Sequence, residues 1–455
     1  MSVDTDHAVD GAHISQRAAS AAPPSRPASD LSSFDLTAPV IDFTLARGHT
    51  LKQATTSGPP QITIAQSEPP KNKDTDETQQ TVVTAGKFIA DFAVSAGKNH
   101  LVAVHGSPNS RIVNATSGQP ERVSTSESID ATFLPQGGIE SLTQKGNVAY
   151  SDGQQPEKRM QAWADSGRFT PADQMLVLAG NPHISSGGMA TSANAIRINR
   201  STGDALAEGD VKTTYSDLKE QPNGALLASS SPIHVTAQSM VAHNAPAIAT
   251  YSGSARLWQD ANVVEAPSIQ FDRDHRSLTA QGTSTRLAKT ILIQPGKTTD
   301  ATTAGKKPSP VGSSPVSITA MKLTYADSER KVHYDGGVLA QGTGFTASAK
   351  TADVFLLSRG QTSGNQTPAG PGQLDRMMAQ GDVLIQQNHR RAEGQTLVYS
   401  TKDDKFVLTG GPPSIFDAEQ GKITGVSLTF FRRDDRVLVE GGTSTPVVTT
   451  TRVAH

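Results

Sequence analysis

Histidine, arginine and acidic side chains are the residues of this sequence whose types could support metal binding or acid–base chemistry. The 12 histidines, among them His243, His275 and His389, are scattered without a ligand spacing such as His-x-x-x-His. The chain has no cysteine, so it has no thiolate nucleophile and no disulfide framework. We find no Ser/His/Asp signature, nucleophile elbow or phosphate loop. The sequence therefore predicts no enzyme and no metal or cofactor site.

Charged residues gather in short stretches between apolar runs. Three of these stretches are residues 273–276 (RDHR), 402–405 (KDDK) and 432–436 (RRDDR). We interpret them, and residues 389–391 (HRR), as solvated hairpin turns. A weaker alternative is contact with lipid phosphates, which arginine can bind in a bidentate way. The net charge of −2 gives no reason to expect a nucleic-acid partner.

The elements that carry these turns recur along the chain. Six times a bulky apolar residue precedes a glycine by eleven positions, and the residues between them begin polar and end in a short strand-like run. The six pairs are Phe169/Gly180, Ile198/Gly209, Phe271/Gly282, Tyr325/Gly336, Tyr399/Gly410 and Phe430/Gly441. Each unit predicts an antiparallel hairpin with a polar turn.

Each predicted hairpin has one apolar face. Strand side chains alternate between two sides, so the positions 13, 11, 4 and 2 residues before each glycine meet on the same side of the hairpin. The candidate residues on this face are Phe169, Leu176, Leu178, Ile196, Ile198, Ile269, Phe271, Leu278, Leu323, Tyr325, Val332, Leu397, Tyr399, Phe406, Leu408, Leu428, Phe430, Val437 and Val439.

The composition agrees with an array of such hairpins. Apolar residues are 35% and aromatic residues 5% of the chain, with 39 glycines and 27 prolines, which favours many short strands and turns. A lone hairpin is marginal in water, whereas stacked hairpins bury a continuous apolar strip. Steps such as Gly146-Asn-Val, Gly209-Asp-Val and Gly381-Asp-Val predict bends where one strand gives way to the next.

Polar and Pro/Gly-rich stretches suggest the domain boundaries. We predict a disordered segment over residues 1–35, a β region over 36–293, a linker or loop over 294–315, a second β region over 316–445 and a tail over 446–455. The array is either one long stack or two consecutive stacks. The first residues have no basic start and no apolar run, so this chain shows no secretory signal.

Several segments resemble the LptA/OstA family, which is associated with organic solvent tolerance and lipopolysaccharide transport. They are residues 145–153 (KGNVAYSDG), 252–282 and 380–411, and the resemblance extends over roughly 120–445, more weakly over 37–110. It implies an open β-jelly roll, a V-shaped stack of antiparallel hairpins, located in the periplasm. It also implies that the candidate apolar residues line a groove for the acyl chains of lipopolysaccharide or a related lipid. Edge strands would then stack on LptC-like and LptD-like domains, or on further copies of the chain.

A second interpretation needs no ligand. Any stack of hairpins must bury its apolar face, so the same residues could form a closed core in a structural or adhesive β-solenoid of the cell envelope. The absence of bound lipid would favour this alternative, and the presence of an apolar groove open to lipid would favour transport.

Overall fold

The structure is a computed structural model that describes most of the chain. The described residues are 3–17, 33–46, 50–67, 78–95, 97–116, 118–135, 138–155, 159–216, 225–227, 229–294, 314–358, 374–387, 389–403, 405–418, 421–431, 436–443 and 446–450. Within these ranges the regular structure is strand, and no helix occurs. The predicted all-β, antiparallel fold is confirmed. The chain divides into two compact units, residues 1–211 and 212–455, which are described separately.

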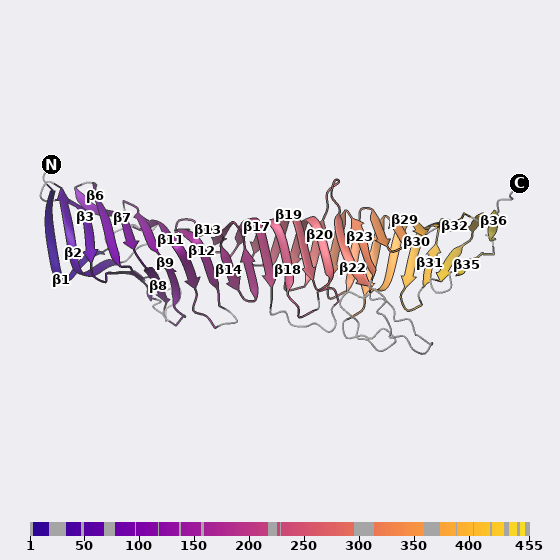
Figure 1. Cartoon of the computed structure of the whole chain (residues 1–455), viewed down its shortest axis with the longest axis horizontal. Helices are drawn as coiled ribbons and strands as arrows, with labels where there is room; N and C mark the ends of the chain where they lie inside the picture. The colour runs from indigo at the N-terminus through magenta and orange to yellow at the C-terminus, as the bar shows by residue number, and fades with distance from the viewer. Residues whose placement is uncertain are drawn as a thin grey trace, which may run out of the picture. The chain divides into compact units, whose positions relative to one another are not determined.

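Unit 1 is built from antiparallel strands of 4 to 15 residues (Figure 1). Its strands are β1 (Val3–Arg17), β2 (Ser33–Ala46), β3 (Thr50–Ser57), β4 (Gln61–Ser67), β5 (Thr78–Thr84), β6 (Lys87–Ser95), β7 (Lys98–Ser107), β8 (Ser110–Thr116), β9 (Arg122–Ser126), β10 (Ser128–Phe133), β11 (Ile139–Ser151), β12 (Gln161–Thr170), β13 (Met175–Ala179), β14 (His183–Ser186), β15 (Met189–Ser192) and β16 (Ala195–Asn199). Strand β17 (Ala205–Tyr215) contains the boundary between the units.

Unit 2 follows the same plan. Its strands are β18 (Ile233–His243), β19 (Ile248–Gln259), β20 (Asn262–Asp272), β21 (Ser277–Gln281), β22 (Ala288–Gln294), β23 (Ser314–Ala320), β24 (Lys322–Ala326), β25 (Lys331–Asp335), β26 (Val338–Gly342), β27 (Phe345–Ala349), β28 (Thr351–Leu356), β29 (Leu374–Gln387), β30 (Arg390–Ser400), β31 (Lys405–Thr409), β32 (Ser414–Asp417), β33 (Gly421–Thr424), β34 (Ser427–Phe431), β35 (Arg436–Glu440) and β36 (Val448–Thr450).

Strand pairing arranges unit 2 in two layers that share their longest strands. Strand β20 shows the principle, because residues 268–272 pair with β21 whereas residues 263–265 pair with β22. Layer A continues through β24, β25, β28, the first half of β29, the second half of β30, β31, β34 and β35. Layer B continues through β23, β26, β27, the second half of β29, the first half of β30, β32, β33 and β36. Unit 1 is built in the same way, and its β12 pairs with β13 at one end and β14 at the other.

Glycines form the corners where a long strand passes from one layer to the other. In β19 the pairing with β20 is interrupted between Ser252 and Ala255, where Gly253 and Ser254 have φ angles of 82° and 57°. A Cβ on Gly253 would lie 2.6 Å from Gln238 Oε1, so glycine avoids both backbone strain and a clash. Gly146, Gly209 and Gly381 also have positive φ, and the residues after them share it, as expected for bends.

The strand register of the six predicted hairpins agrees with the spacing in the sequence. In the last two hairpins Leu397 pairs with Leu408 and Tyr399 with Phe406, and Leu428 pairs with Val439. The other four pair their corresponding positions in the same manner. Alternation within the strands, combined with a polar turn between them, is therefore sufficient to fix which side chains face each other.

Parts of the chain differ from expectations based on composition. Residues 3–17 form β1 and pair with β2, although residues 1–35 are rich in polar and small residues. Alternation explains this strand, since Ala12 is buried against the core of unit 1 with Ala8 and Ile14 packed beside it. Strand β36 lies in the predicted tail and pairs with β33. Most of the predicted linker, residues 295–313, lies outside the described residues.

Candidate functional site

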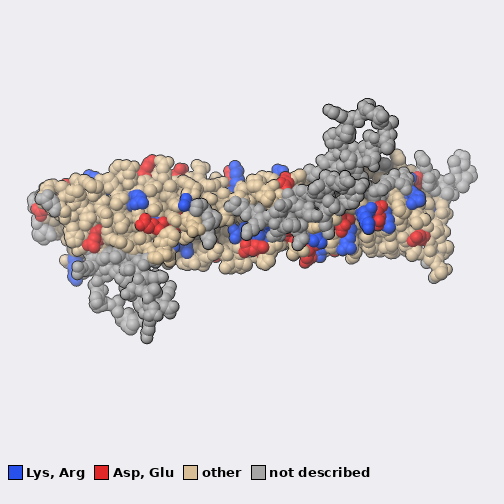
Figure 2. All heavy atoms as spheres, turned by 90° about the horizontal axis from the view of Figure 1, so that it is seen from below, with Lys and Arg blue, Asp and Glu red and all other residues tan. Residues whose placement is uncertain are grey.

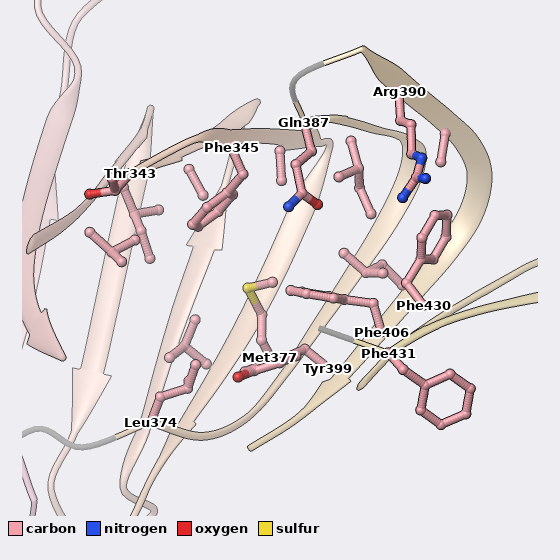
Figure 3. Close-up of a pocket in the computed structure, with 18 of the residues that line it drawn as sticks. Thr343, Phe345, Leu374, Met377, Gln387, Arg390, Tyr399, Phe406, Phe430 and Phe431 are labelled. Atoms are coloured by element: carbon pink, nitrogen blue, oxygen red, sulfur yellow. The ribbon is translucent and has the colours of Figure 1, made fainter. Parts of the chain in front are cut away.

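A cavity of about 140 Å³ lies between the two layers near the C-terminal end of unit 2. From layer A it is lined by side chains such as Met377, Tyr399 and Phe406. From layer B it is lined by Phe345 and Ile385, together with the small side chains of β26, β27 and β30. Figure 3 shows that Phe345 and Met377 extend toward one another from opposite layers. The cavity is therefore an apolar space enclosed by both layers, in the position where their interior faces meet.

The polar side chains that reach the cavity include Thr343, Gln387, Arg390 and Arg436. The Arg390 Nε donates a hydrogen bond of 2.9 Å to Asp417 Oδ2, so its charge is paired within layer B. The Arg436 guanidinium lies 4.4 Å from the centre of the Phe431 ring, a cation–π arrangement. The cavity thus combines apolar walls with a few polar groups, and among them the Arg436 guanidinium suits a negatively charged or polar end of an apolar ligand.

The structure brings five of the sequence-predicted residues to this cavity. They are Leu397, Tyr399, Phe406, Phe430 and Val437. The rings of Tyr399 and Phe406 stack with centroids 4.5 Å apart, so neighbouring strands present a continuous aromatic surface.

Three further predicted residues belong to the same two hairpins. Leu408 and Leu428 are fully buried, and Val439 is half-buried. They support the cavity wall without forming its lining. Whether any of the predicted residues binds a lipid stays a prediction.

The predicted residues in the middle of unit 2 are buried, and none of them lines the C-terminal cavity. Each of them is at most 2% exposed, namely Ile269, Phe271, Leu278, Leu323, Tyr325 and Val332. Tyr215 contributes an edge-to-face contact with Phe271, with ring centroids 5.1 Å apart. Its hydroxyl lies 2.7 Å from that of Tyr251. Burial raises the pKa of both tyrosines, so both hydroxyls stay neutral.

The predicted residues of unit 1 lie in the hairpins β12–β13 and β16–β17. Leu178 and Ile196 are buried, whereas Phe169, Leu176 and Ile198 are half-buried. A smaller cavity of about 30 Å³ occurs elsewhere in unit 1, around residues such as those of β4, β5 and β10, and includes none of these five.

Sequence reasoning did not find the layer B wall of the larger cavity. Phe345 and Ile385 belong to β27 and β29, which lie outside the eleven-residue hairpin units. Met377 was missed as well, although it pairs with Tyr399 in layer A. Each strand alternates, and this signal could have found its inward residues. The sequence does not indicate which strand of the opposing layer each inward residue would face.

Charged groups near the surface are largely balanced by neighbours of opposite sign. Arg197 lies 2.6 Å from Glu208, and Lys350 lies 2.9 Å from Asp382. In the face seen in Figure 2, blue and red side chains lie close together along the described surface. Among the residues that the structure describes, no cluster of three or more His, Cys, Asp or Glu side chains could hold a metal ion. The same residues include no helix long and apolar enough to cross a membrane.

These features define an antiparallel two-layer β protein with an apolar interior. Residues 98–204, from the start of β7 to the turn before β17, match the family model of "LptA/(LptD N-terminal domain) LPS transport protein". The resemblance to the LptA/OstA family is thereby confirmed. Families of this kind comprise transport proteins of the periplasm and envelope rather than enzymes, and the match supports a role in lipopolysaccharide transport at family level.

Several solved structures resemble this chain, and one of them is a homologue of LptA. It is the crystal structure of LptH, the LptA homologous periplasmic component of the conserved lipopolysaccharide transport device from Pseudomonas aeruginosa. The identity is 12% and the TM-score 0.25, over 34% of this chain and 92% of that chain. No curated protein matches the chain.

Proposed function

We propose that the protein is a lipid carrier or bridge in lipopolysaccharide transport, and that the C-terminal cavity of unit 2 holds an acyl chain. The observation that carries this proposal is the apolar wall formed by Tyr399, Phe406 and Phe345 across two layers. Each methylene that leaves water there contributes about 0.8 kcal/mol to binding. The LptA/OstA-type match supports the same class of lipid.

The size of the cavity limits what it can hold. Its volume of about 140 Å³ is close to that of an engineered apolar cavity that accommodates one benzene-sized molecule. We therefore propose that it holds a segment of one acyl chain. The remaining acyl chains of a lipopolysaccharide would lie outside it.

The terminal strand of layer A supports the bridging part of the proposal. Among the described residues β35 is paired with β34 alone, and Leu438 on it is 47% exposed. An edge strand with unpaired backbone groups can add a strand from another chain. We propose that related LptC-like or LptD-like domains, or a second copy, dock there in the periplasm.

Binding can be tested with lipopolysaccharide and with dodecanoate, using displacement of a fluorescent fatty acid. Phe406→Asp places a carboxylate on the cavity wall, and we expect it to weaken binding by at least about tenfold. The matched control is Val407→Asp, which changes the adjacent residue on the other side of β31 and should bind as the unchanged protein does. Equal affinities for the two variants, or no binding by the unchanged protein, would overturn the proposal.

The structural β-solenoid is the second candidate function. The specific observation in its favour is the interior around Phe271 and Tyr325, whose side chains are at most 2% exposed. It predicts that no lipid is retained by the purified protein. The same displacement measurement decides between the two candidates.

A further inference from the structure

Three buried residues, Ala225, Leu226 and Leu227, lie between β17 and β18 in a segment that is not part of a strand. Their exposed fractions are 1%, 2% and 1%. In the sequence they occur inside a polar insertion, KEQPNGALLASSSP, whose neighbours give no sign of an apolar core. Two adjacent leucines buried to this degree are characteristic of an interior rather than of a solvated loop.

Buried polar groups of layer A hold the N-terminal side of this segment. The Leu226 N–H donates a hydrogen bond of 2.7 Å to the Tyr325 hydroxyl. The Ala225 N–H donates one of 3.0 Å to Asp327 Oδ1, and the Tyr325 hydroxyl donates to the same carboxylate oxygen. Backbone N–H groups in a buried, non-repetitive segment need such partners, because an unpaired donor away from water is costly.

The C-terminal side is held by two further buried side chains. Arg276 Nη1 donates a hydrogen bond of 2.9 Å to the Leu227 carbonyl oxygen. Gln259 Nε2 donates to the carbonyl oxygens of Ser229 at 3.1 Å and Ser231 at 2.6 Å. Arg276 is 5% exposed and Gln259 is 1% exposed. These holding residues lie 28 to 102 positions from their partners in the sequence, so the contacts belong to the tertiary structure.

The holding residues stand at the ends of both layers. Gln259 is the last residue of β19, at the end that pairs with β20 in layer B. Arg276 and Asp327 lie in the turns that end the layer A hairpins β20–β21 and β24–β25. The glycine corner at Gly253 is at the opposite end of the layer B half of β19. Layer A therefore holds Ala225–Leu227, and the end of β19 in layer B holds Ser229 and Ser231, on the side away from the corners.

We infer that Ala225–Leu227 is an internal occupant that closes the middle of unit 2. Leu226 and Leu227 take up interior space that an apolar ligand would otherwise enter. Ligand binding is thereby confined to the C-terminal cavity. The confinement of ligand rests on the proposed function, whereas the closure itself does not.

Closure can be measured without any lipid, because the chain has no native cysteine. Leu278→Cys, in the closed middle, is expected to react slowly with a water-soluble thiol reagent. Adding Leu226→Ala and Leu227→Ala should raise that rate by at least about tenfold, since local opening then exposes the interior. Val437→Cys, at the C-terminal cavity, should react at the same rate with and without the two alanine substitutions.

Two matched controls separate closure from general loosening of the core. Ser230→Ala changes an exposed side chain of the same segment and should leave the rate at Leu278→Cys unchanged. Ile233→Ala removes a fully buried side chain at the start of β18 and should raise the rate far less than the double substitution. An unchanged rate in the double variant, or an equal increase with Ile233→Ala, overturns the inference.

A milder variant covers the case in which the double substitution unfolds the protein. Tyr325→Phe removes only the hydroxyl that accepts the Leu226 N–H, and circular dichroism should show an unchanged strand signal. We expect its rate at Leu278→Cys to rise by about threefold, less than in the double variant. A rate equal to that of the unchanged tyrosine would contradict the inference.

Dodecanoate distinguishes closure from the proposed function. It should protect Val437→Cys in both backgrounds, and Leu278→Cys only when Leu226 and Leu227 are alanine. Protection of Leu278→Cys with the leucines present would overturn confinement. If dodecanoate protects neither cysteine, the proposed function fails, while the rate increase without lipid still establishes closure.

Discussion

The hairpins β20–β21 and β30–β31 are built from the same sequence unit but have different interiors. In the first, Phe271 pairs with Leu278 and both are at most 2% exposed. In the second, the corresponding Tyr399 pairs with Phe406, and both line a cavity. The hairpin pattern therefore determines which residues face inward. It does not determine whether the space that they face is filled.

The contents of the interior explain the difference. In the middle of unit 2 the space is occupied by Tyr215 and by Leu226 and Leu227, which come from outside the hairpin units. At the C-terminal end the facing residues of layer B include Ala347 and Ala392, whose methyl groups fill little of the gap. A closed core and an apolar cavity thus arise from one strand pattern through a few residues on the opposing side.

The largest expected effect compares two phenylalanines at equivalent hairpin positions. Phe271→Ala removes a side chain that is 1% exposed and should lower the free energy of unfolding by about 3–5 kcal/mol. Phe430→Ala removes a half-buried ring that already borders a cavity, and the loss should be less than about half as large. Urea denaturation followed by circular dichroism measures both. Equal losses would show that the two interiors are packed alike.

The second prediction concerns a substitution that fills the cavity. Ala347→Phe places a ring in the space between the layers, and we expect displacement assays to show at least about a tenfold loss of dodecanoate affinity. Ser348→Phe adds the same ring to the neighbouring residue, which faces the other side of β27, and should leave affinity unchanged. Unchanged affinity in Ala347→Phe would place the ligand elsewhere.

Much of this comparison could be predicted from the sequence. The alternation of Leu397, Tyr399, Phe406 and Leu408, with a polar turn between, determines both the hairpin and its register. Such signals are local, because the interacting positions are separated by only a short turn. The same local character explains why five of the residues that line the cavity were among those predicted.

The features that could not be predicted depend on contacts between residues that are far apart in the sequence. Leu226 occurs in a stretch that is typical of a loop, and its partner Tyr325 is 99 residues away. Layer B strands such as β26 and β27 lack the eleven-residue spacing, so their facing partners could not be assigned. Residues 3–17 alternate as a strand does, but their pairing with β2 across residues 18–32 could not be read from composition.

The third prediction concerns the edge strand at the C-terminal end. Leu438→Pro removes one backbone donor from β35 and should reduce concentration-dependent assembly severalfold, as measured by light scattering. Leu438→Ala keeps the backbone N–H and loses only an exposed side chain, so it should assemble nearly as well. Circular dichroism controls for loss of the fold. A strictly monomeric unchanged protein, with no binding to related domains, would remove the support for bridging and favour the closed solenoid.

The smallest expected effect is a pH dependence in the turn that carries Arg276. His275 Nδ1 lies 2.8 Å from Asp272 Oδ2, and this hydrogen bond and the charge of Asp272 raise the pKa of His275. Burial alone would raise the pKa of Asp272, but hydrogen bonds from His275 outweigh it, and the net shift is downward. His275 and Asp272 are therefore both charged over a wider pH range in the folded protein than in the unfolded chain.

The direction of the effect follows from these two shifts. The raised pKa of His275 stabilises the folded protein, and this stabilisation is complete below pH 6.5, the pKa of the histidine in the unfolded chain. It is lost as the pH rises through the pKa of His275 in the folded protein. The lowered pKa of Asp272 gives a second stabilisation, which is present above pH 3.8, the pKa of the carboxyl group in the unfolded chain. It is lost as the pH falls through the pKa of Asp272 in the folded protein. The thermal midpoint of His275→Gln should therefore fall slightly below that of the unchanged protein near about pH 5, and the two should coincide by about pH 9. A constant difference across this range would show that the pair contributes nothing to the turn that holds Leu227.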